Sequence, residues 1–384
     1  MNGLVPAAVA LAVGWGLAGS RRGTTGVGGA PRRQRRVGGR GLLGLAGGRD
    51  DPEPARWATR RDLGPLVVPR PTPGRLSLGL AHHRLVAAEA GHSVLVVGPT
   101  QSRKTSGFAV PAILEWDGPV VAASVKSDLA RHTVAWRRGC GQVWVYDPSA
   151  VTSLPGASWS PLDASVTWEG ARRVAASLTE VARSSAGSLT DGDFWYATAA
   201  KLLAPLLLAA AISGRTMLDV VRWLDTQEVD EVYEALRTGG DERALQAAQA
   251  SWGRDDRQRS AVYTTAETAV EVFADPVVAA SERAGPAGPA AGVATGADVD
   301  PVRLLDGRNT LYLCAPAHDQ RRLRPLFATL VAQVVEAAYE RAARQGGPLD
   351  PPLLVVLDEA ANVAPLAELD VLASTAAGHG VQLV

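Results

Sequence analysis

A loop that opens with glycine and closes with lysine and threonine carries the clearest chemical signal in the chain. Residues 98–105, GPTQSRKT, match the phosphate-binding pattern G-x-x-x-x-G-K-[ST] (Walker A) at every fixed position except the sixth. Backbone N–H groups of such a loop converge on phosphates, the lysine reaches their terminal oxygens, and the hydroxyl ligates Mg²⁺. We therefore predict that the nucleotide-binding residues are Gly98, Pro99, Thr100, Gln101, Ser102, Arg103, Lys104 and Thr105.

Arg103 is the departure from this pattern. Glycine at that place permits an unusual backbone φ or a close approach, so arginine costs about 1–3 kcal/mol if the strain is retained. The guanidinium also adds a charge that attracts phosphate, and the sequence leaves open which effect dominates. Lys104 is one of only three lysines in a chain with 39 lysine and arginine residues, which indicates a need for a compact ammonium.

Two carboxylates follow a second apolar run. Asp358 and Glu359 come directly after residues 353–357, LLVVL, as in a Walker B strand. Asp358 would hold the Mg²⁺ shell and Glu359 would polarise the attacking water. Two such motifs in this order favour an ATP site over a chance match. The predicted catalytic set is Lys104, Thr105, Asp358 and Glu359, the predicted metal ligands are Thr105 and Asp358, and the predicted cofactors are ATP and Mg²⁺.

These residues need a parallel sheet to position them. Apolar, β-branched runs at 94–97, 120–125, 142–146, 310–314, 353–358 and 381–384 predict buried strands, and helical patterns between them predict a doubly wound α/β core. Ligands of such sheets collect at the carboxyl ends of the strands. Lys126 and Asp147 follow two of these strands, and they are either site residues or local caps and surface ion pairs.

A long stretch of helical periodicity interrupts the strand pattern. It extends from Pro161 to about Gly285, with the clearest helices predicted at 168–182, 194–213, 217–224 and 260–273. We expect an inserted all-α domain. The apolar run 202–212 is too short to span a bilayer, so a buried core helix is predicted. The aromatic residues 194–196 also read as core, the alternative being exposed rings that stack on bases.

Length and composition limit the kinds of protein that this chain can be. A chain of 384 residues is long enough for two or three domains, and 46% hydrophobic and 20% charged residues are ordinary for a folded protein. Its formal net charge is zero, so any contact with nucleic acid must come from a local basic surface. The two cysteines, Cys140 and Cys314, have no metal-ligand spacing and are expected to be structural thiols. The pair His82-His83 is expected in a solvated turn.

The N-terminal segment carries the membrane prediction. Residues 1–20 have no charged side chain, and 3–19 would span about 25 Å as a helix. We predict a transmembrane anchor at 1–20, an Arg/Gly-rich linker at 21–50, and a single-pass protein of the plasma (inner) membrane with its body in the cytoplasm. The first part of the ATPase core is expected at 51–160, the insertion at 161–300, and the second part at 301–384. That last part ends inside a core strand, so a truncated chain is expected.

Several longer segments resemble one protein family. They are residues 98–114, 124–129, 147–148, 193–207 and 357–383, and they resemble the coupling proteins of type IV secretion, the TraG-like conjugative DNA-transfer ATPases of high-GC Gram-positive bacteria. The resemblance extends from about Arg56 to the end of the chain. It implies a RecA-like P-loop motor core with an all-α domain, a homo-hexamer at the inner membrane, and ATP hydrolysis that moves DNA or a relaxase–DNA complex to the secretion channel.

The chain departs from this family in three ways. Arg103 replaces the loop glycine, one short apolar segment stands where two spans are usual, and the region after Val384 is absent. The resemblance implies that this region holds the polar sensor and an inter-subunit arginine. Two alternatives therefore stay open: a membrane-tethered adaptor that binds its substrate without turnover, and an ATPase that secretes protein.

Overall fold

The computed structural model describes residues 57–99, 101–124, 126–186, 192–239, 241–282, 298–316, 318–358 and 369–384. The chain divides into two compact units, Met1–Gly64 and Pro65–Val384, and both motifs belong to the second unit. The predicted anchor (1–20), the linker (21–50), Thr100 and Glu359 lie outside the described residues.

A parallel sheet forms the centre of this second unit. In the described residues its strand order is β5 (Val143–Tyr146), β6 (Thr310–Cys314), β4 (Val120–Ser124), β7 (Leu353–Asp358), β8 (Val381–Leu383). Nearly every residue of these strands is buried, as the continuous apolar runs predict for a sheet covered on both faces. Five of the six predicted strands are thereby confirmed.

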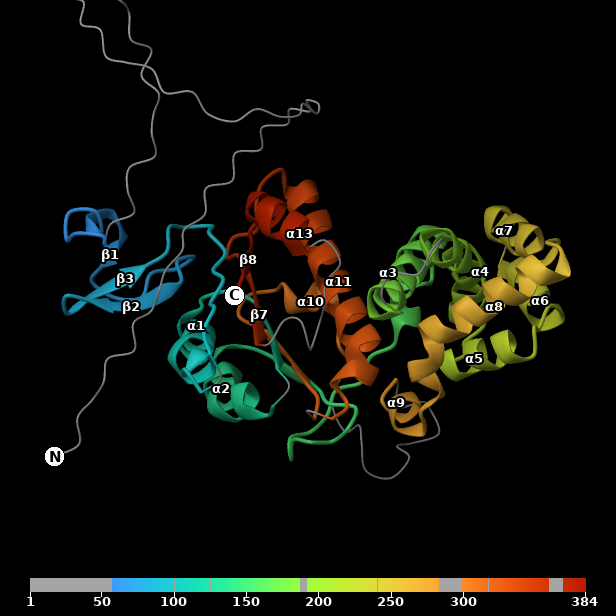
Figure 1. The fold of residues 1–384 in the computed structure, drawn as a ribbon, viewed down its shortest axis with the longest axis horizontal. Helices are drawn as coiled ribbons and strands as arrows, with labels where there is room; N and C mark the ends of the chain where they lie inside the picture. Colours follow the sequence, from blue (N-terminus) through green and yellow to red (C-terminus); the bar gives the residue numbers. More distant parts are fainter. Residues whose placement is uncertain are drawn as a thin grey trace, which may run out of the picture. The chain divides into compact units, whose positions relative to one another are not determined.

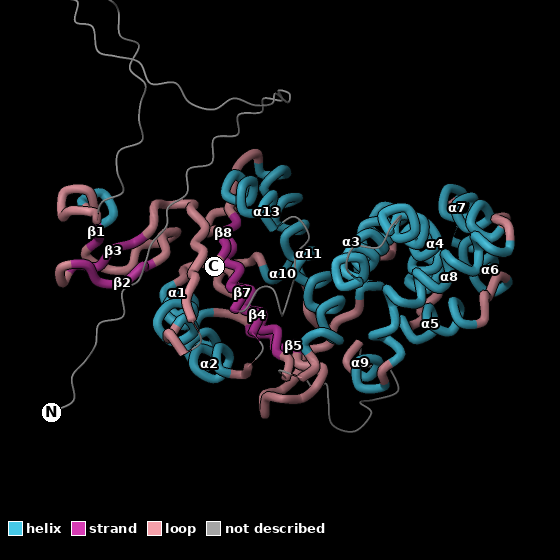
Figure 2. The backbone as a smooth tube through the Cα atoms, in the orientation of Figure 1, coloured by secondary structure: helices cyan, strands magenta, loops and turns pink. Residues whose placement is uncertain are grey.

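Helices cover both faces of this sheet (Figures 1 and 2). Alternate residues of each strand point to opposite faces, so Val120 and Ala122 pack with helices α1 (Val110–Glu115) and α2 (Asp128–Cys140). Val121 and Ala123 belong to the other face, whose core includes α11 (Gln320–Gln345). The predicted α/β core is confirmed.

A helical insertion separates β5 from β6. Its helices are α3 (Trp168–Ala186), α4 (Gly192–Ile212), α5 (Met217–Asp225), α6 (Asp230–Gly239), α7 (Glu242–Trp252), α8 (Asp256–Val270) and α9 (Pro276–Ala280). The short helix α10 (Pro301–Leu304) follows them and contacts α11. Most of α4 is buried among α3, α5, α6, α7 and α8. In the described part of the chain, α4 is the one helix long and apolar enough to cross a membrane, and 67% of its apolar window is buried inside the protein.

The aromatic residues that begin α4 divide between core and surface. Tyr196 is buried as predicted, and Trp195 packs partly against the same core. The core prediction is wrong for Phe194, which is 57% exposed and makes an edge contact with Trp195. The helix presents successive residues about 100° apart, so three neighbouring aromatics cannot all face inward.

A small antiparallel sheet precedes the core. Its order is β1 (Val67–Val68), β3 (Arg84–Ala87), β2 (Ser77–Ala81). His82 and His83 connect β2 to β3 with φ of 50° and 62°, the left-handed pair of a two-residue hairpin turn. Both are exposed, which confirms the predicted solvated turn.

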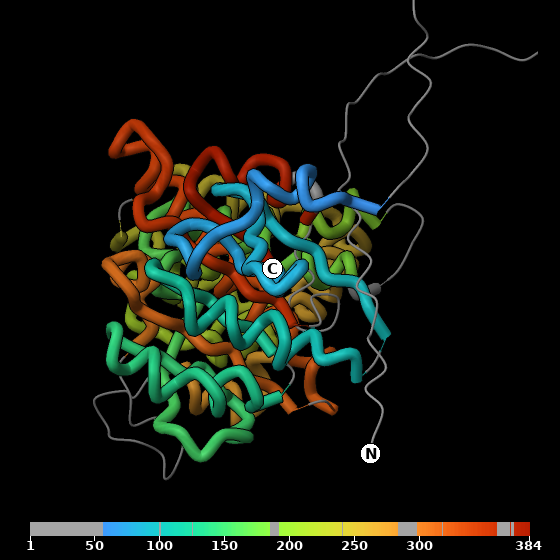
Figure 3. Tube along the Cα trace, turned by 90° about the vertical axis from the view of Figure 1, so that its left-hand side faces the viewer, coloured from blue at the N-terminus to red at the C-terminus, as the bar shows by residue number. Residues whose placement is uncertain are grey.

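The predicted buried strand at 94–97 is wrong. The Val94 N–H donates to the Leu383 carbonyl (2.8 Å), but Leu95 is 88% and Val97 84% exposed. Figure 3 shows the C-terminal end beside the cyan segments that precede the loop. A strand needs a partner backbone along its length, and among the described residues Val94 alone of this segment bonds to β8. An apolar run by itself therefore does not make a strand.

Candidate functional site

The two motifs meet at the carboxyl end of β7. The Thr105 hydroxyl oxygen lies 3.0 Å from Oδ2 and 3.2 Å from Oδ1 of Asp358, although the residues are 253 positions apart. Thr105 begins the π-helical turn Thr105–Ala109 that leads into α1, and Asp358 ends a central buried strand. The structure thus brings together the two predicted metal ligands on the face that α1 and α2 cover.

Lys104 closes the loop on itself. Its ammonium donates to the carbonyl oxygens of Gly98 (2.7 Å) and Pro99 (2.8 Å). A Cβ on Gly98 would lie 2.9 Å from the Ser102 hydroxyl, so a larger residue there would require the Ser102 side chain to move. Two of the three ammonium protons are engaged with loop carbonyls, and the group remains half-exposed.

Arg103 has the backbone conformation that glycine would relieve. Its φ is +64°, and its carbonyl accepts from the Gly107 N–H at 2.7 Å. The left-handed region costs a non-glycine residue about 1–2 kcal/mol. The backbone strain expected for an arginine in place of the loop glycine is therefore present at Arg103. The guanidinium is exposed beside the loop.

Lys126 and Asp147 have different surroundings. The Asp147 carboxylate is buried and accepts from the Val151 N–H (3.0 Å) and from the N–H and hydroxyl of Thr152 (2.6 and 2.7 Å). The local-cap alternative thus accounts for Asp147. Lys126 is exposed, and its backbone N–H donates to the Ser124 hydroxyl.

Ser124 was not among the predicted site residues. Its hydroxyl donates to Asp358 Oδ2 at 3.3 Å, and it lies directly opposite Asp358 in the β4–β7 register. The sequence could have indicated this contact only through position: Ser124 and Asp358 both end parallel strands, and the carboxyl ends of neighbouring strands meet at one edge of a sheet.

The donor set fits a magnesium ion. The described residues hold no cluster of three or more His, Cys, Asp or Glu side chains. A hydroxyl and one carboxylate are instead the sparse oxygen set with which proteins bind Mg²⁺ together with waters and substrate phosphates. Cys314 lies beside Ser124 in register, and burial raises the pKa of its thiol, so this group stays protonated and structural as expected.

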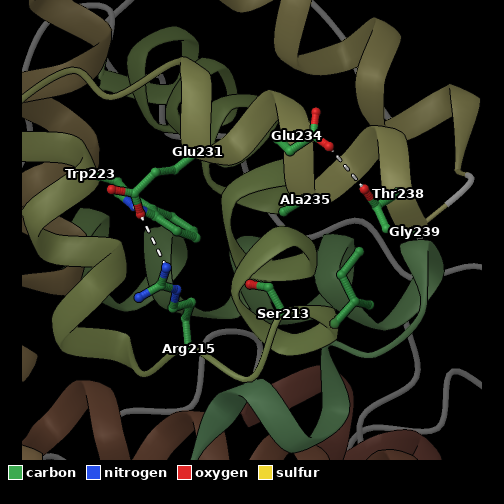
Figure 4. A pocket seen from close by; sticks show the side chains of 9 residues that line it. Ser213, Arg215, Trp223, Glu231, Glu234, Ala235, Thr238 and Gly239 are labelled. Atoms are coloured by element: carbon green, nitrogen blue, oxygen red, sulfur yellow. Dashed lines mark hydrogen bonds and ion pairs between the residues drawn. The ribbon is translucent and has the colours of Figure 1, made fainter.

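A pocket of about 470 Å³ lies in the helical insertion (Figure 4). Its charged groups are largely engaged with protein partners: Glu231 accepts from both terminal nitrogens of Arg222 and from the Trp223 indole, and these bonds lower the pKa of Glu231 to about 2. Arg215 approaches the same carboxylate at 3.7 Å. The pocket shares no lining residue with the loop, so it is no part of the nucleotide site.

Comparison with known proteins identifies the family. The profile of the family described as "Type IV secretory system Conjugative DNA transfer" matches residues 66–384. The conjugal transfer protein TraG of Escherichia coli is 24% identical over 312 residues, which cover 75% of this chain and 47% of TraG. VirD4 of Rhizobium rhizogenes is 26% identical over 307 residues, covering 77% and 42%. The chain thus spans about half the length of the curated relatives it matches.

Solved structures of a conjugative coupling protein are also similar. TrwBdeltaN70 in complex with sulphate has a TM-score of 0.45 and 18% identity, and the match covers 69% of this chain and 61% of that one. TrwB in complex with ADP and Mg²⁺ has a TM-score of 0.44 and 17% identity, covering 69% and 62%. On the match to the family profile, the chain belongs to the type IV secretory system conjugative DNA transfer family.

Proposed function

We propose that the chain is the ATPase core of a membrane-anchored coupling protein, which uses ATP hydrolysis to recruit and translocate DNA or a relaxase–DNA complex. The observation that carries this proposal is the contact between Thr105 and Asp358. Two distant motifs meet there as a nucleotide site requires. Family membership supports the DNA-transfer role, and the TrwB complex with ADP and Mg²⁺ supports the class of ligand.

We propose a role for the loop backbone, for the two residues that end the loop, and for the carboxylates of Asp358 and Glu359. Lys104 exchanges its loop carbonyls for phosphate oxygens, and the backbone N–H groups of 98–105 bind the same phosphates. Thr105 and Asp358 would hold Mg²⁺, and the ion would supply positive charge that neutralises the phosphates. The sequence motif assigns Glu359 the water that attacks.

The wider assembly is also a proposal. We infer an anchor at 1–20, a linker at 21–50, ATPase segments at 51–160 and 301–384, and an all-α domain at 161–300. A homo-hexamer at the inner membrane that contacts the secretion channel follows from the family resemblance, as does the Gram-positive origin.

A second candidate is an adaptor that binds its cargo without turnover. The positive φ of Arg103 favours it, because a strained arginine replaces glycine in the loop that must approach the phosphates. The two candidates differ in whether DNA stimulates phosphate release.

Lys104→Ala in the full chain tests nucleotide binding. We expect a fluorescent, non-hydrolysable ATP analogue with Mg²⁺ to bind this variant about 100-fold more weakly, because charged hydrogen bonds to phosphate are lost. The control is Lys201→Ala, which removes an exposed lysine from α4. Equal binding by Lys104→Ala and the unmodified chain would contradict the proposal. DNA-stimulated phosphate release from ATP then supports the motor, and binding without release supports the adaptor.

A further inference from the structure

Ser124 occupies a buried position between the centre of the sheet and the candidate site. It is the last residue of β4 and is 1% exposed. Register pairs it with Asp358 on β7 and with Cys314 on β6. Side chains of paired residues in neighbouring parallel strands point to the same face, about 4.8 Å apart. The fold thus places a hydroxyl beside the Asp358 carboxylate.

The direction of the Ser124 hydrogen bonds is determined by their partners. The Lys126 N–H donates to the Ser124 hydroxyl oxygen at 3.2 Å, so this oxygen acts there as an acceptor. Its single proton is therefore available for Asp358 Oδ2 at 3.3 Å, a carboxylate oxygen that can only accept when ionised. A hydroxyl that accepts one bond while donating another is polarised, which strengthens the bond to the carboxylate.

Two hydroxyls bond to Asp358 in the described part of the chain, and they belong to different elements. Thr105 belongs to the loop and is itself a proposed magnesium ligand. Ser124 belongs to a central strand bonded on both sides, by β6 and β7. When the Thr105 oxygen turns to a metal ion, the Ser124 bond still holds the carboxylate.

We propose that Ser124 is a positioning residue for Mg²⁺: it holds the Asp358 carboxylate in the orientation that binds the ion, without contacting the ion itself. This inference rests on the proposed nucleotide function and adds to it a residue outside both motifs. Hydrogen-bond partners of metal-binding carboxylates typically change metal affinity by about 10–100-fold when they are removed.

The test is a magnesium titration of nucleotide binding in the full chain. A fluorescent, non-hydrolysable ATP analogue is bound first in EDTA and then at increasing MgCl₂. For Ser124→Ala we expect unchanged affinity in EDTA and an Mg²⁺ midpoint raised about 10-fold. Ser124→Cys, which keeps the side-chain volume but is a weak donor, should behave alike, whereas Ser124→Thr, which keeps the hydroxyl, should restore the midpoint.

Ser251→Ala is the matched control, because Ser251 is also buried and its hydroxyl donates to the Ala247 carbonyl within α7, away from the candidate site. An unshifted Mg²⁺ midpoint in Ser124→Ala would overturn the inference while the nucleotide function stands. Equal weakening in EDTA and in Mg²⁺ would also overturn it, since that result means a structural role alone. If the unmodified chain binds no analogue in either buffer, the proposed function fails and the inference falls with it.

Discussion

The two ends of the central strands use their polar groups in opposite ways. At the amino ends, the Arg137 side chain is fully buried and donates to several protein acceptors. It donates at 2.7–3.3 Å to the Thr310 hydroxyl and to the carbonyls of Trp116, Gly118, Arg308 and Asn309. At the carboxyl ends, Lys104 and Asp358 are half-exposed and bond to a loop and to hydroxyls.

The polar groups at the two ends differ in whether they can exchange their hydrogen-bond partners. Arg137 ties the end of α2 to the residues that precede β4 and β6, and burial lowers its pKa without a carboxylate among its hydrogen-bond partners. Groups so completely engaged cannot exchange partners for a ligand. Lys104 and Thr105 can exchange theirs, because water or phosphate can replace a half-exposed bond at little net change in free energy. Arg137 therefore holds the amino ends together, whereas Lys104 and Thr105 at the carboxyl ends keep groups that a ligand could reach.

Arg137→Met should have the largest effect on stability. It leaves several buried carbonyls without donors, so we expect the free energy of unfolding to fall by about 3–5 kcal/mol. Urea denaturation followed by circular dichroism measures this. Arg138→Met is the control, since Arg138 is the exposed neighbour on the same helix. If the free energy of unfolding falls no more than in the control, the buried hydrogen bonds of Arg137 do not hold the amino ends of the strands together.

Gly380→Ala should have an intermediate effect. Gly380 precedes β8 with φ of +75°, and a Cβ there would lie 2.4 Å from the Leu349 backbone nitrogen. Gly346 has a similar φ of +71° with nothing within 4 Å. Both substitutions lose about 1 kcal/mol from the left-handed backbone. Gly380→Ala loses a further 1–3 kcal/mol or so from overpacking. Equal urea midpoints for the two variants would show that the amino end of β8 has room to adjust.

Arg103→Gly should have the smallest effect, and in the opposite direction. Glycine relieves about 1–2 kcal/mol of left-handed strain but loses more chain entropy on folding, so a net gain of about 0.5–1 kcal/mol is expected. The melting temperature should rise. Arg103→Ala removes the charge and keeps the strained φ, so it should not share the rise. A lower melting temperature for Arg103→Gly would show that the guanidinium stabilises the loop more than its backbone strains it.

Much of the fold was predictable from local pattern. The strands β4 to β8 follow continuous apolar runs, and the long apolar helix α4 was predicted as core. Helices α6 and α7 were not among the helices predicted individually, because they are short and their stability comes from packing against α4. The meeting of Thr105 with Asp358 was predicted because their motifs require it chemically.

Local pattern was enough to predict the strands β4 to β8 and to propose residues for phosphate and magnesium, since apolar period and side-chain chemistry are local properties. Only the folded chain shows that Leu95 and Val97 are exposed, that Arg137 bonds to the residues at the amino ends of the sheet, and that Ser124 reaches Asp358. Each depends on which distant backbone lies alongside, and the pairing of segments far apart in the chain cannot be read from local pattern.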